Sequence, residues 1–214
     1  MCGIAGIVSL NKVSGFNVED IISLSQSLKH RGPDDEGFLF ASGDKITIAG
    51  GESTPGEVFN SSFAYCPKQK IQSLNFQHAD FKLALVHRRL SIIDTSPAGH
   101  QPMCLPAPKE SGGAPDENYW IVFNGEIYNY VEIKNILLSK GYRFQTKTDT
   151  EVLLNSYKEW GMDCVNQFNG MWSFVIYDKI KNIVFGSRDR TGVKPFYYYK
   201  NKNVFAFASE LKAL

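Results

Sequence analysis

Cys2 is the residue of this chain whose type and position point most directly to chemistry. Because cysteine is small, we expect an aminopeptidase to remove Met1 and to leave a thiol and a free α-amine on one residue. An α-amine has a reference pKa of about 7.7–8.0 and a thiol about 8.5, so both exchange protons near neutral pH. The amine can then act as general base for its own side chain, which makes Cys2 a candidate N-terminal nucleophile. The alternative is a small buried side chain at the end of a strand.

Other residue types that often carry chemistry lack the spacing that a metal or cofactor site requires. The cysteines at positions 2, 66, 104 and 164 form no CxxC pair, and the four histidines show no metal-ligand spacing. The Ser-Gly-Gly run at 111–113 is surrounded by proline and acidic residues, unlike a phosphate-binding loop. We therefore expect no metal site and no cofactor site in this chain.

Composition and charge exclude several classes of protein. The 214 residues carry 23 Lys+Arg against 22 Asp+Glu, a net charge of +1, so we expect no nucleic-acid partner, which would need clustered basic residues. No apolar run approaches the roughly 18 to 20 residues that span a bilayer, and the start of the chain lacks the regions of a signal peptide. We expect a cytoplasmic globular protein with no membrane partner.

Hydrophobic periodicity predicts an α+β fold. Helical patterns cover 18–29, 131–139 and 150–160, and Asn17 with Asp20 matches a capping box before the first helix. Runs rich in β-formers predict strands at 4–10, 38–40, 45–49, 82–86, 119–123, 171–177, 182–186, 195–199 and 204–208. Many strands and few helices favour layered, largely antiparallel sheets. Surface insertions are expected at about 50–79 and 105–117, where Gly, Pro and polar residues gather.

Six motifs follow one another along the chain: MCGIAGI at 1–7, HRGPD at 30–34, HRRLSIID at 87–94, GHQPM at 99–103, FNGEIYN at 123–129 and RDRTGVKP at 188–195. This series resembles the class II (N-terminal nucleophile) glutamine amidotransferases. The Leu-Ser-Ile at 90–92 favours the glutaminase domain of glutamine-hydrolysing asparagine synthetases. The resemblance covers residues 2–214 and implies an N-terminal nucleophile hydrolase fold, a four-layer αββα sandwich with two mostly antiparallel sheets between helices.

The resemblance also assigns catalytic roles. It implies that Cys2 attacks the side-chain carbonyl of glutamine and that a thioester forms. It implies an oxyanion hole made of the Asn124 side-chain amide and the Gly125 backbone N–H, and a neutral amide suits this role because it donates without competing as an acid. On spacing alone, Asn124 and Gly125 are equally compatible with a tight turn after a strand.

Recognition of free glutamine needs a cation and an anion because the substrate is a zwitterion. Arg89 matches the residue of the family that holds the carboxylate, and its guanidinium offers a planar two-bond fork. Asp149 and Glu126 match the acidic side that receives the α-ammonium, and backbone contacts are expected from Leu90 and Ile92. The alternatives are a surface charge for Arg89, a helix cap for Asp149 and a solvated turn residue for Glu126.

Four further residues of the motifs are expected to be structural. Arg31 and Asp34 are expected to stabilise the loop that closes over the site. Arg188 and Asp189 are expected to form an ion pair near its far end.

The resemblance implies a role in nitrogen transfer. Hydrolysis of glutamine to glutamate would supply ammonia for ATP-dependent asparagine synthesis from aspartate, carried out by a C-terminal synthetase domain that follows residue 214 in the family. ATP and Mg are expected only in that domain, and the end of this chain is expected to be a domain boundary. Two alternatives stay open: an ammonia donor for another amide or amine synthesis, and a non-catalytic glutamine sensor. A homodimer also stays open.

Overall fold

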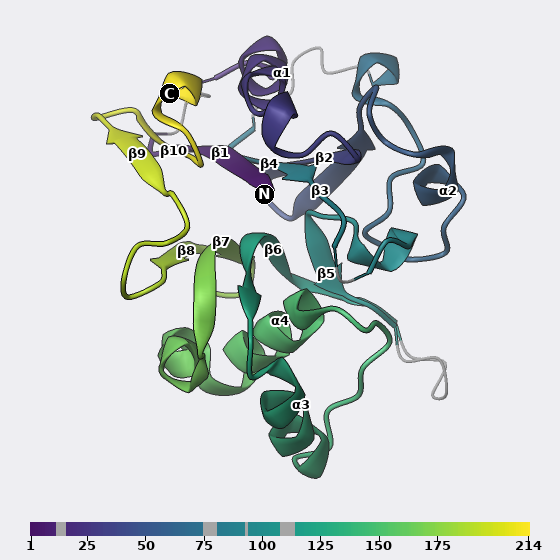
Figure 1. Ribbon diagram of the computed structural model, residues 1–214. Helices are drawn as coiled ribbons and strands as arrows, with labels where there is room; N and C mark the ends of the chain where they lie inside the picture. The colour runs from purple at the N-terminus through teal and green to yellow at the C-terminus, as the bar shows by residue number, and fades with distance from the viewer. Residues whose placement is uncertain (12–15, 75–80, 93, 108–113) are drawn as a thin grey trace.

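Two antiparallel sheets lie face to face in the computed structural model, which describes residues 1–11, 16–74, 81–92, 94–107 and 114–214 (Figure 1). Sheet A has the order β3 (Lys45–Gly50), β2 (Asp35–Ser42), β4 (Leu83–Arg89), β1 (Gly3–Ser9), β10 (Val204–Ala208) and β9 (Tyr197–Lys200). Sheet B has the order β5 (Met103–Leu105), β6 (Asp116–Ile127), β7 (Gly170–Asp178) and β8 (Ile183–Arg188). Every strand pair within the two sheets is antiparallel.

Helices form the two outer layers (Figure 1). Helix α1 (Val18–Ser27) lies over sheet A, while α3 (Tyr130–Ser139) and α4 (Asp149–Trp160) lie against sheet B; the short α2 (Gly56–Phe59) lies to one side. The layers therefore follow the order α, β, β, α, and the expected four-layer sandwich is confirmed. None of the helices within the described ranges has the length and apolar character needed to cross a membrane.

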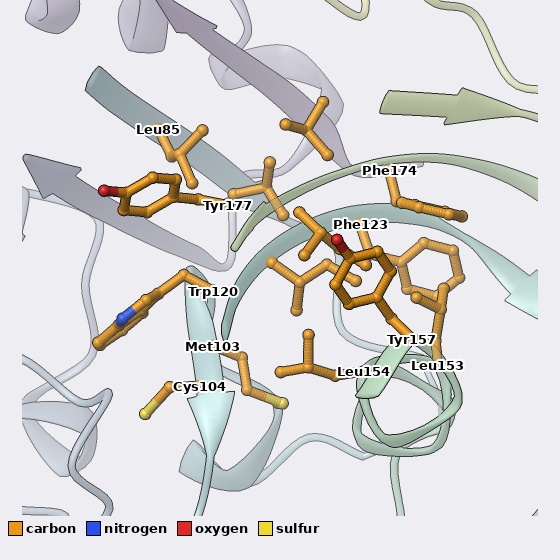
Figure 2. Close-up of a cluster of buried hydrophobic side chains, with 14 of the residues drawn as sticks. Leu85, Met103, Cys104, Trp120, Phe123, Leu153, Leu154, Tyr157, Phe174 and Tyr177 are labelled. Atoms are coloured by element: carbon orange, nitrogen blue, oxygen red, sulfur yellow. The ribbon is translucent and has the colours of Figure 1, made fainter. Parts of the chain in front are cut away.

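The alternation of side chains along the strands builds two hydrophobic cores. On β4, Leu83 and Leu85 join the core between the sheets, while Ala84 and Val86 join the core under α1. This period of two is the geometry of a strand that is buried on both faces. Figure 2 shows part of the larger core, where aromatic and aliphatic side chains of β6 and β7 meet those of α4.

The predicted helices and strands are present with small shifts at their ends. Asn17 and Asp20 form the predicted capping box through two side-chain-to-backbone bonds of 2.9 Å. Strand β5 was not predicted, because three residues are too few to show a pattern. Leu105 pairs with Asp116 across β5 and β6, so both ends of the expected insertion at 105–117 belong to strands. Residues 108–113 of that stretch, including the Ser-Gly-Gly run, lie outside the described residues.

Much of the segment expected as a surface insertion at 50–79 belongs to the core. Val58, Tyr65, Cys66 and Ile71 are buried, and Lys70 forms a bridge with Gly50 at the end of edge strand β3. The expectation of a surface loop is wrong for these residues, because the side chains of Val58, Tyr65, Cys66 and Ile71 pack into the two hydrophobic cores. Residues 75–79 lie outside the described residues.

Strand β1 has hydrogen-bonded neighbours on both edges, β4 on one side and β10 on the other. Its start is held further by Ser209, whose hydroxyl accepts from Ile4 N at 2.9 Å and whose N–H donates to Ile4 O at 2.8 Å. Cys2, the residue just before β1, is therefore attached to a strand that is paired on both edges.

Arg88 and Glu36 form a buried ion pair between sheet A and α1. The Nη2 atom of Arg88 lies 2.6 Å from Glu36 Oε1, although it is not aligned as a hydrogen bond, and both side chains are at least 98% buried. Arg88 also donates to Ser25 of α1 and to Ser53 of the loop that follows β3. Removing one partner of a buried pair leaves an uncompensated charge, which costs about 3–5 kcal/mol.

We therefore predict that Arg88→Leu lowers the free energy of unfolding by about 3–5 kcal/mol, because the Glu36 carboxylate stays buried without its cation. Urea unfolding followed by circular dichroism measures this change. The double variant with Glu36→Leu should recover much of the loss. Lys158→Ala breaks a partly exposed pair with Asp116 and should cost no more than about 1 kcal/mol. A double variant as unstable as Arg88→Leu alone would contradict the charge argument.

Candidate active site

A small cavity opens between the two sheets at the end where β1 begins. Its walls include Cys2 before β1, Arg89 at the end of β4, Asn124 in β6 and Asp149 at the start of α4. The cavity volume is about 120 Å³, the volume of roughly four water molecules. It suits part of a small polar molecule and excludes a polymer.

A larger and mostly apolar cavity of about 910 Å³ lies toward the other end of the space between the sheets. Val8, Leu83, Val175 and Phe205 are among its lining residues. None of the site residues predicted from the sequence borders it, so the small cavity with the nucleophile is the candidate active site.

Cys2 lies at the rim of sheet A with its thiol against the backbone of Leu90. Its Sγ is 3.4 Å from Leu90 N and 3.6 Å from Leu90 O. Burial raises the pKa of the Cys2 thiol, and the charges of Arg89 and Lys194 oppose this rise. The buried thiol therefore stays protonated near neutral pH and needs a base before it can attack.

The backbone of Cys2 is held by the side chain of Arg31, which is itself held by Glu210. Arg31 donates from Nε to Cys2 O at 3.0 Å and from Nη1 to Glu210 at 3.0 Å. Burial opposes ionisation of Glu210, but hydrogen bonds from Arg31, His30 and Lys212 lower the pKa of its carboxyl to about 2. Arg31 thus fixes the backbone of the nucleophile itself. From the sequence we expect it instead to stabilise the loop that closes over the site.

Asp34 contacts the expected loop directly. Its Oδ2 accepts from Ser91 N at 2.8 Å, and its own N–H donates to Arg89 O at 3.0 Å. These bonds hold the backbone that follows β4, which includes the Leu90 atoms against the Cys2 thiol.

Asn124 brings a free donor into the cavity. Asn124 is 1% exposed, and among the described residues its Nδ2 has no hydrogen-bond partner. Leaving a buried donor unpaired costs about 1–3 kcal/mol, so such an atom is rarely tolerated without a reason. Gly125 follows, and a side chain there would lie 2.3 Å from Met171 O of β7. Both residues lie within strand β6 and not in a tight turn.

Two carboxylates line the same cavity as Arg89, Asp149 at the start of α4 and Glu126 in β6. Asp149 Oδ2 accepts from Ile127 N at 3.0 Å and thereby joins α4 to β6. Burial raises the pKa of Asp149 to about 6, and the charge of Glu126 in the same cavity adds to the rise. Asp149 accepts backbone N–H bonds, but within the described residues neither acid forms an ion pair with a basic side chain. This part of the cavity is therefore suited to an ammonium ligand.

Arg89 is buried at the cavity with part of its guanidinium bound to its own loop. Nη1 donates to Ser96 O at 3.0 Å, and Nη2 donates to Asp94 O. A Cβ atom at Gly99 would lie 2.0 Å from Arg89 Nη2, so a side chain there would displace the guanidinium from this position. Ile92 stands at the rim with its side chain 75% exposed.

The structure brings together all the residues predicted for the site, and it adds others that were not assigned to it, including three that carry buried polar side chains. His87, Gln101 and Lys194 also line the cavity and are buried. Burial lowers the pKa of His87 to about 3, so its imidazole is neutral. Lys194 Nζ lies 3.6 Å from the sulfur of Met1, which is still attached to Cys2. All three belong to motifs of the sequence, but only the packing of the sheets shows that they share one cavity.

Arg188 and Asp189 bind backbone groups of the turn that follows β8. Arg188 donates to Gly192 O and Lys194 O, and Asp189 accepts from Val193 N and Lys194 N. The expected ion pair between them is replaced by these bonds, because a tight turn leaves its own polar groups without strand partners. Their effect is to place Lys194 in the cavity.

Within the described ranges, no group of three or more His, Cys, Asp or Glu side chains is arranged to hold a metal ion.

Comparison with known proteins identifies relatives over the whole chain. Residues 73–214 match the family model of the glutamine amidotransferase domain. Asparagine synthetase [glutamine-hydrolyzing] proteins are similar over all of this chain: a putative one, number 2, from Methanocaldococcus jannaschii at 40% identity, and number 3 from Bacillus subtilis at 32%. The chain spans 35% and 27% of their lengths, respectively.

The fold is shared with a solved amidotransferase. Glutamine phosphoribosylpyrophosphate amidotransferase from B. subtilis, complexed with ADP and GMP, superposes with a TM-score of 0.72 at 23% identity. The similarity covers 99% of this chain and 42% of that one. The expected N-terminal nucleophile hydrolase fold is confirmed.

We predict that Asp149→Asn stabilises the protein at high pH and not at low pH. The folded pKa of about 6 lies above the reference value of 3.8, so folding binds a proton between these values and stability falls as pH rises through them. The neutral amide removes this effect and should add up to about 3 kcal/mol at pH 8. Urea unfolding at pH 4 and pH 8 measures it.

Glu132→Gln, at an exposed position in the first turn of α3, is the matched control and should change stability little at either pH. Equal destabilisation of Asp149→Asn at both pH values would show that packing, and not charge, decides the effect.

Proposed function

The chain belongs to the glutamine amidotransferase domain family, and we propose that its cavity hydrolyses the side-chain amide of L-glutamine to glutamate and ammonia. One observation carries this proposal: the unpaired Asn124 amide donor is buried in the same cavity as the Cys2 thiol. A developing oxyanion would supply the acceptor that Asn124 lacks, and donors placed in advance for such a charge are worth a factor of about 10²–10³ in rate.

Catalysis would begin once Met1 is removed and the α-amine of Cys2 is free. The amine takes the proton of the thiol, and the sulfur forms a bond to the side-chain carbonyl carbon of glutamine. Asn124 Nδ2 and the Gly125 N–H receive the negative charge on the carbonyl oxygen. The proton then passes from the amine to the leaving nitrogen, the carbon–nitrogen bond breaks, and ammonia departs from a thioester.

Water completes the reaction. The same amine takes a proton from water, and the hydroxide attacks the thioester carbon. The oxyanion again rests on Asn124 and Gly125, the carbon–sulfur bond breaks, and the protonated amine returns a proton to the sulfur. Glutamate leaves and Cys2 is restored. The buried thiol depends on this base because its own pKa is raised.

The amino-acid end of glutamine would be held by opposite charges. Arg89 would bind the carboxylate with the donors that do not contact its own loop, and Asp149 with Glu126 would receive the α-ammonium. Leu90 and Ile92 would border the aliphatic stem. Because the pKa of Asp149 is about 6, its charge is present above that pH and binding of glutamine weakens below it.

We further propose that the ammonia serves asparagine synthesis from aspartate in a C-terminal synthetase region. The names and greater lengths of the relatives support this assignment. ATP and Mg²⁺ would bind in that region and not in the cavity of this chain. Donation to another acceptor is the alternative. A glutamine sensor is disfavoured because binding alone needs neither Cys2 nor an unpaired Asn124 donor.

We predict that Cys2→Ala abolishes glutamate release from glutamine while glutamine still binds, because the nucleophile is lost and the charged wall remains. Glutamate production and calorimetric binding measure the two effects. In the unchanged protein, intact mass should show loss of Met1 and one adduct on Cys2 from an electrophilic glutamine analogue, and excess glutamine should suppress it.

The companion variant Asn124→Leu should lower kcat by about 10²–10³ with a small change in KM. Ser156→Ala, which removes a buried hydroxyl of α4 that donates to Val152 O, is the control for loss of a buried polar group. Turnover by Cys2→Ala, or a processed protein that binds glutamine without cleaving it, would overturn the proposal.

For the acceptor, we predict that deleting the gene in its source cells stops transfer of heavy nitrogen from the side-chain amide of labelled glutamine to asparagine. Restoring the gene with Cys2→Ala should not recover the transfer. Label that disappears from a different product, with asparagine unchanged, would assign another acceptor.

A further inference from the structure

Phe123 lies at the point where strand β6 loses its neighbour on one edge. Strand β5 pairs Met103 with Ile121, and the same antiparallel register would place residue 101 opposite Phe123. Strand β5 begins only at Met103, however, so no backbone strand continues there. The N–H and C=O of Phe123 on that edge need other partners, because buried backbone groups are rarely left unpaired.

Two side chains from different parts of the fold take the place of the missing strand. Gln101 Oε1 accepts from Phe123 N at 2.7 Å, and His87 Nε2 lies 3.1 Å from Phe123 O. Because His87 is neutral and its partner is a carbonyl, Nε2 carries the proton and donates. We refer to Gln101 and His87 as the Phe123 clamp.

The clamp joins three elements around the cavity. His87 belongs to β4 of sheet A, directly opposite Ile4 of β1. Gln101 also donates from Nε2 to Thr150 Oγ1 of α4 at 3.3 Å. Both clamp residues are at least 95% buried. Strand β6 is therefore tied to the sheet that carries the nucleophile and to the helix that begins with Asp149.

The clamp ends one residue before the Asn124 donor. The His87 imidazole reaches from β4, which pairs with β1, to the Phe123 carbonyl oxygen. It therefore sets how far Asn124 and Gly125 lie from Cys2. Positioning of this kind matters because a displacement of about 1 Å can cost about 10²-fold in rate. Neither clamp residue needs to touch the reacting atoms to have this effect.

We propose that Gln101 and His87 are positioning residues that hold the oxyanion donors Asn124 and Gly125 at the correct distance from Cys2. The inference rests on the proposed glutaminase function. It separates attack on a carbonyl, which needs the oxyanion donors, from simple reactivity of the thiol, which does not.

The test compares two reactions of Cys2 in the protein with Met1 removed. Gln101→Met removes the acceptor for Phe123 N, and we expect kcat for glutamine hydrolysis to fall about 10²-fold with KM within a few-fold. Alkylation of Cys2 by iodoacetamide displaces iodide and forms no oxyanion, so its rate should stay unchanged. Gln101→Glu keeps an acceptor oxygen and should retain most of the activity.

Asn155→Leu provides the control for lost stability. Asn155 is also a buried amide that bonds a backbone group, Glu151 O at 3.1 Å, but it does not line the cavity. We expect this variant to lower the unfolding midpoint as Gln101→Met does and to leave kcat unchanged.

A double-variant cycle tests whether the two residues act as one unit. His87→Leu should also lower kcat while sparing alkylation. The variant lacking both side chains should lose less than the product of the single losses, since both residues act through the backbone of Phe123.

Three results would overturn the proposal. They are unchanged kcat in Gln101→Met, a rise in KM with kcat retained, and equal losses of hydrolysis and alkylation. Failure of the proposed function is seen separately, as absence of glutamate release by the unchanged protein whose Cys2 still alkylates.

Discussion

The position of Cys2 depends on the pairing of β1, because a residue next to a strand bonded on both edges cannot move independently of the sheet. Strands β4 and β10 flank β1. Ser209 bonds Ile4 near the start of β1, and Arg31 donates to the Cys2 carbonyl. Segments from near both ends of the chain thus converge on one nucleophile. Asn124, Glu126, Arg89 and Asp149 lie on strands or on a helix that pack around this strand, so sheet packing sets where their backbones lie. Leu90 and Lys194 lie in loops, which bonds to Asp34 and Asp189 hold in place. Sites carried on strands and helices in this way keep reacting groups in place with little reorganisation.

The period of two along β4 assigns opposite tasks to consecutive residues. His87 and Arg89 point toward the cavity, whereas Arg88 points toward α1 and pairs with Glu36. Strand β4 therefore supplies both the arginine of a buried ion pair, which also bonds Ser25 of α1, and polar groups of the site. A shift of one residue in its register would exchange these faces. The register of β4 with β1 and β2 on both edges prevents that shift.

Two groups in the cavity are held in states that folding alone would disfavour. Asn124 buries a donor that has no partner among the described residues, and Asp149 has its charge disfavoured by burial. Such groups lower stability and are tolerated where ligand binding or catalysis benefits from them. The two cores, which are packed mostly with aliphatic and aromatic side chains, offset this cost. The cores between the layers thus supply stability, and the cavity at the rim of the sandwich carries the chemistry.

The sequence by itself determined the class of fold, the long helices and most strands, because hydrophobic periodicity and caps are local properties. It also determined the family and the identity of the main site residues, since six ordered motifs carry them. Only the tertiary structure decided what those residues touch. The burial of Val58, Tyr65, Cys66 and Ile71 in the cores, the short β5, and the meeting of His87, Gln101 and Lys194 in one cavity arise from contacts between segments far apart in sequence. The bonds of Gln101 and His87 to Phe123 exist because one strand ends where another continues, and no local pattern records where a neighbouring strand will stop.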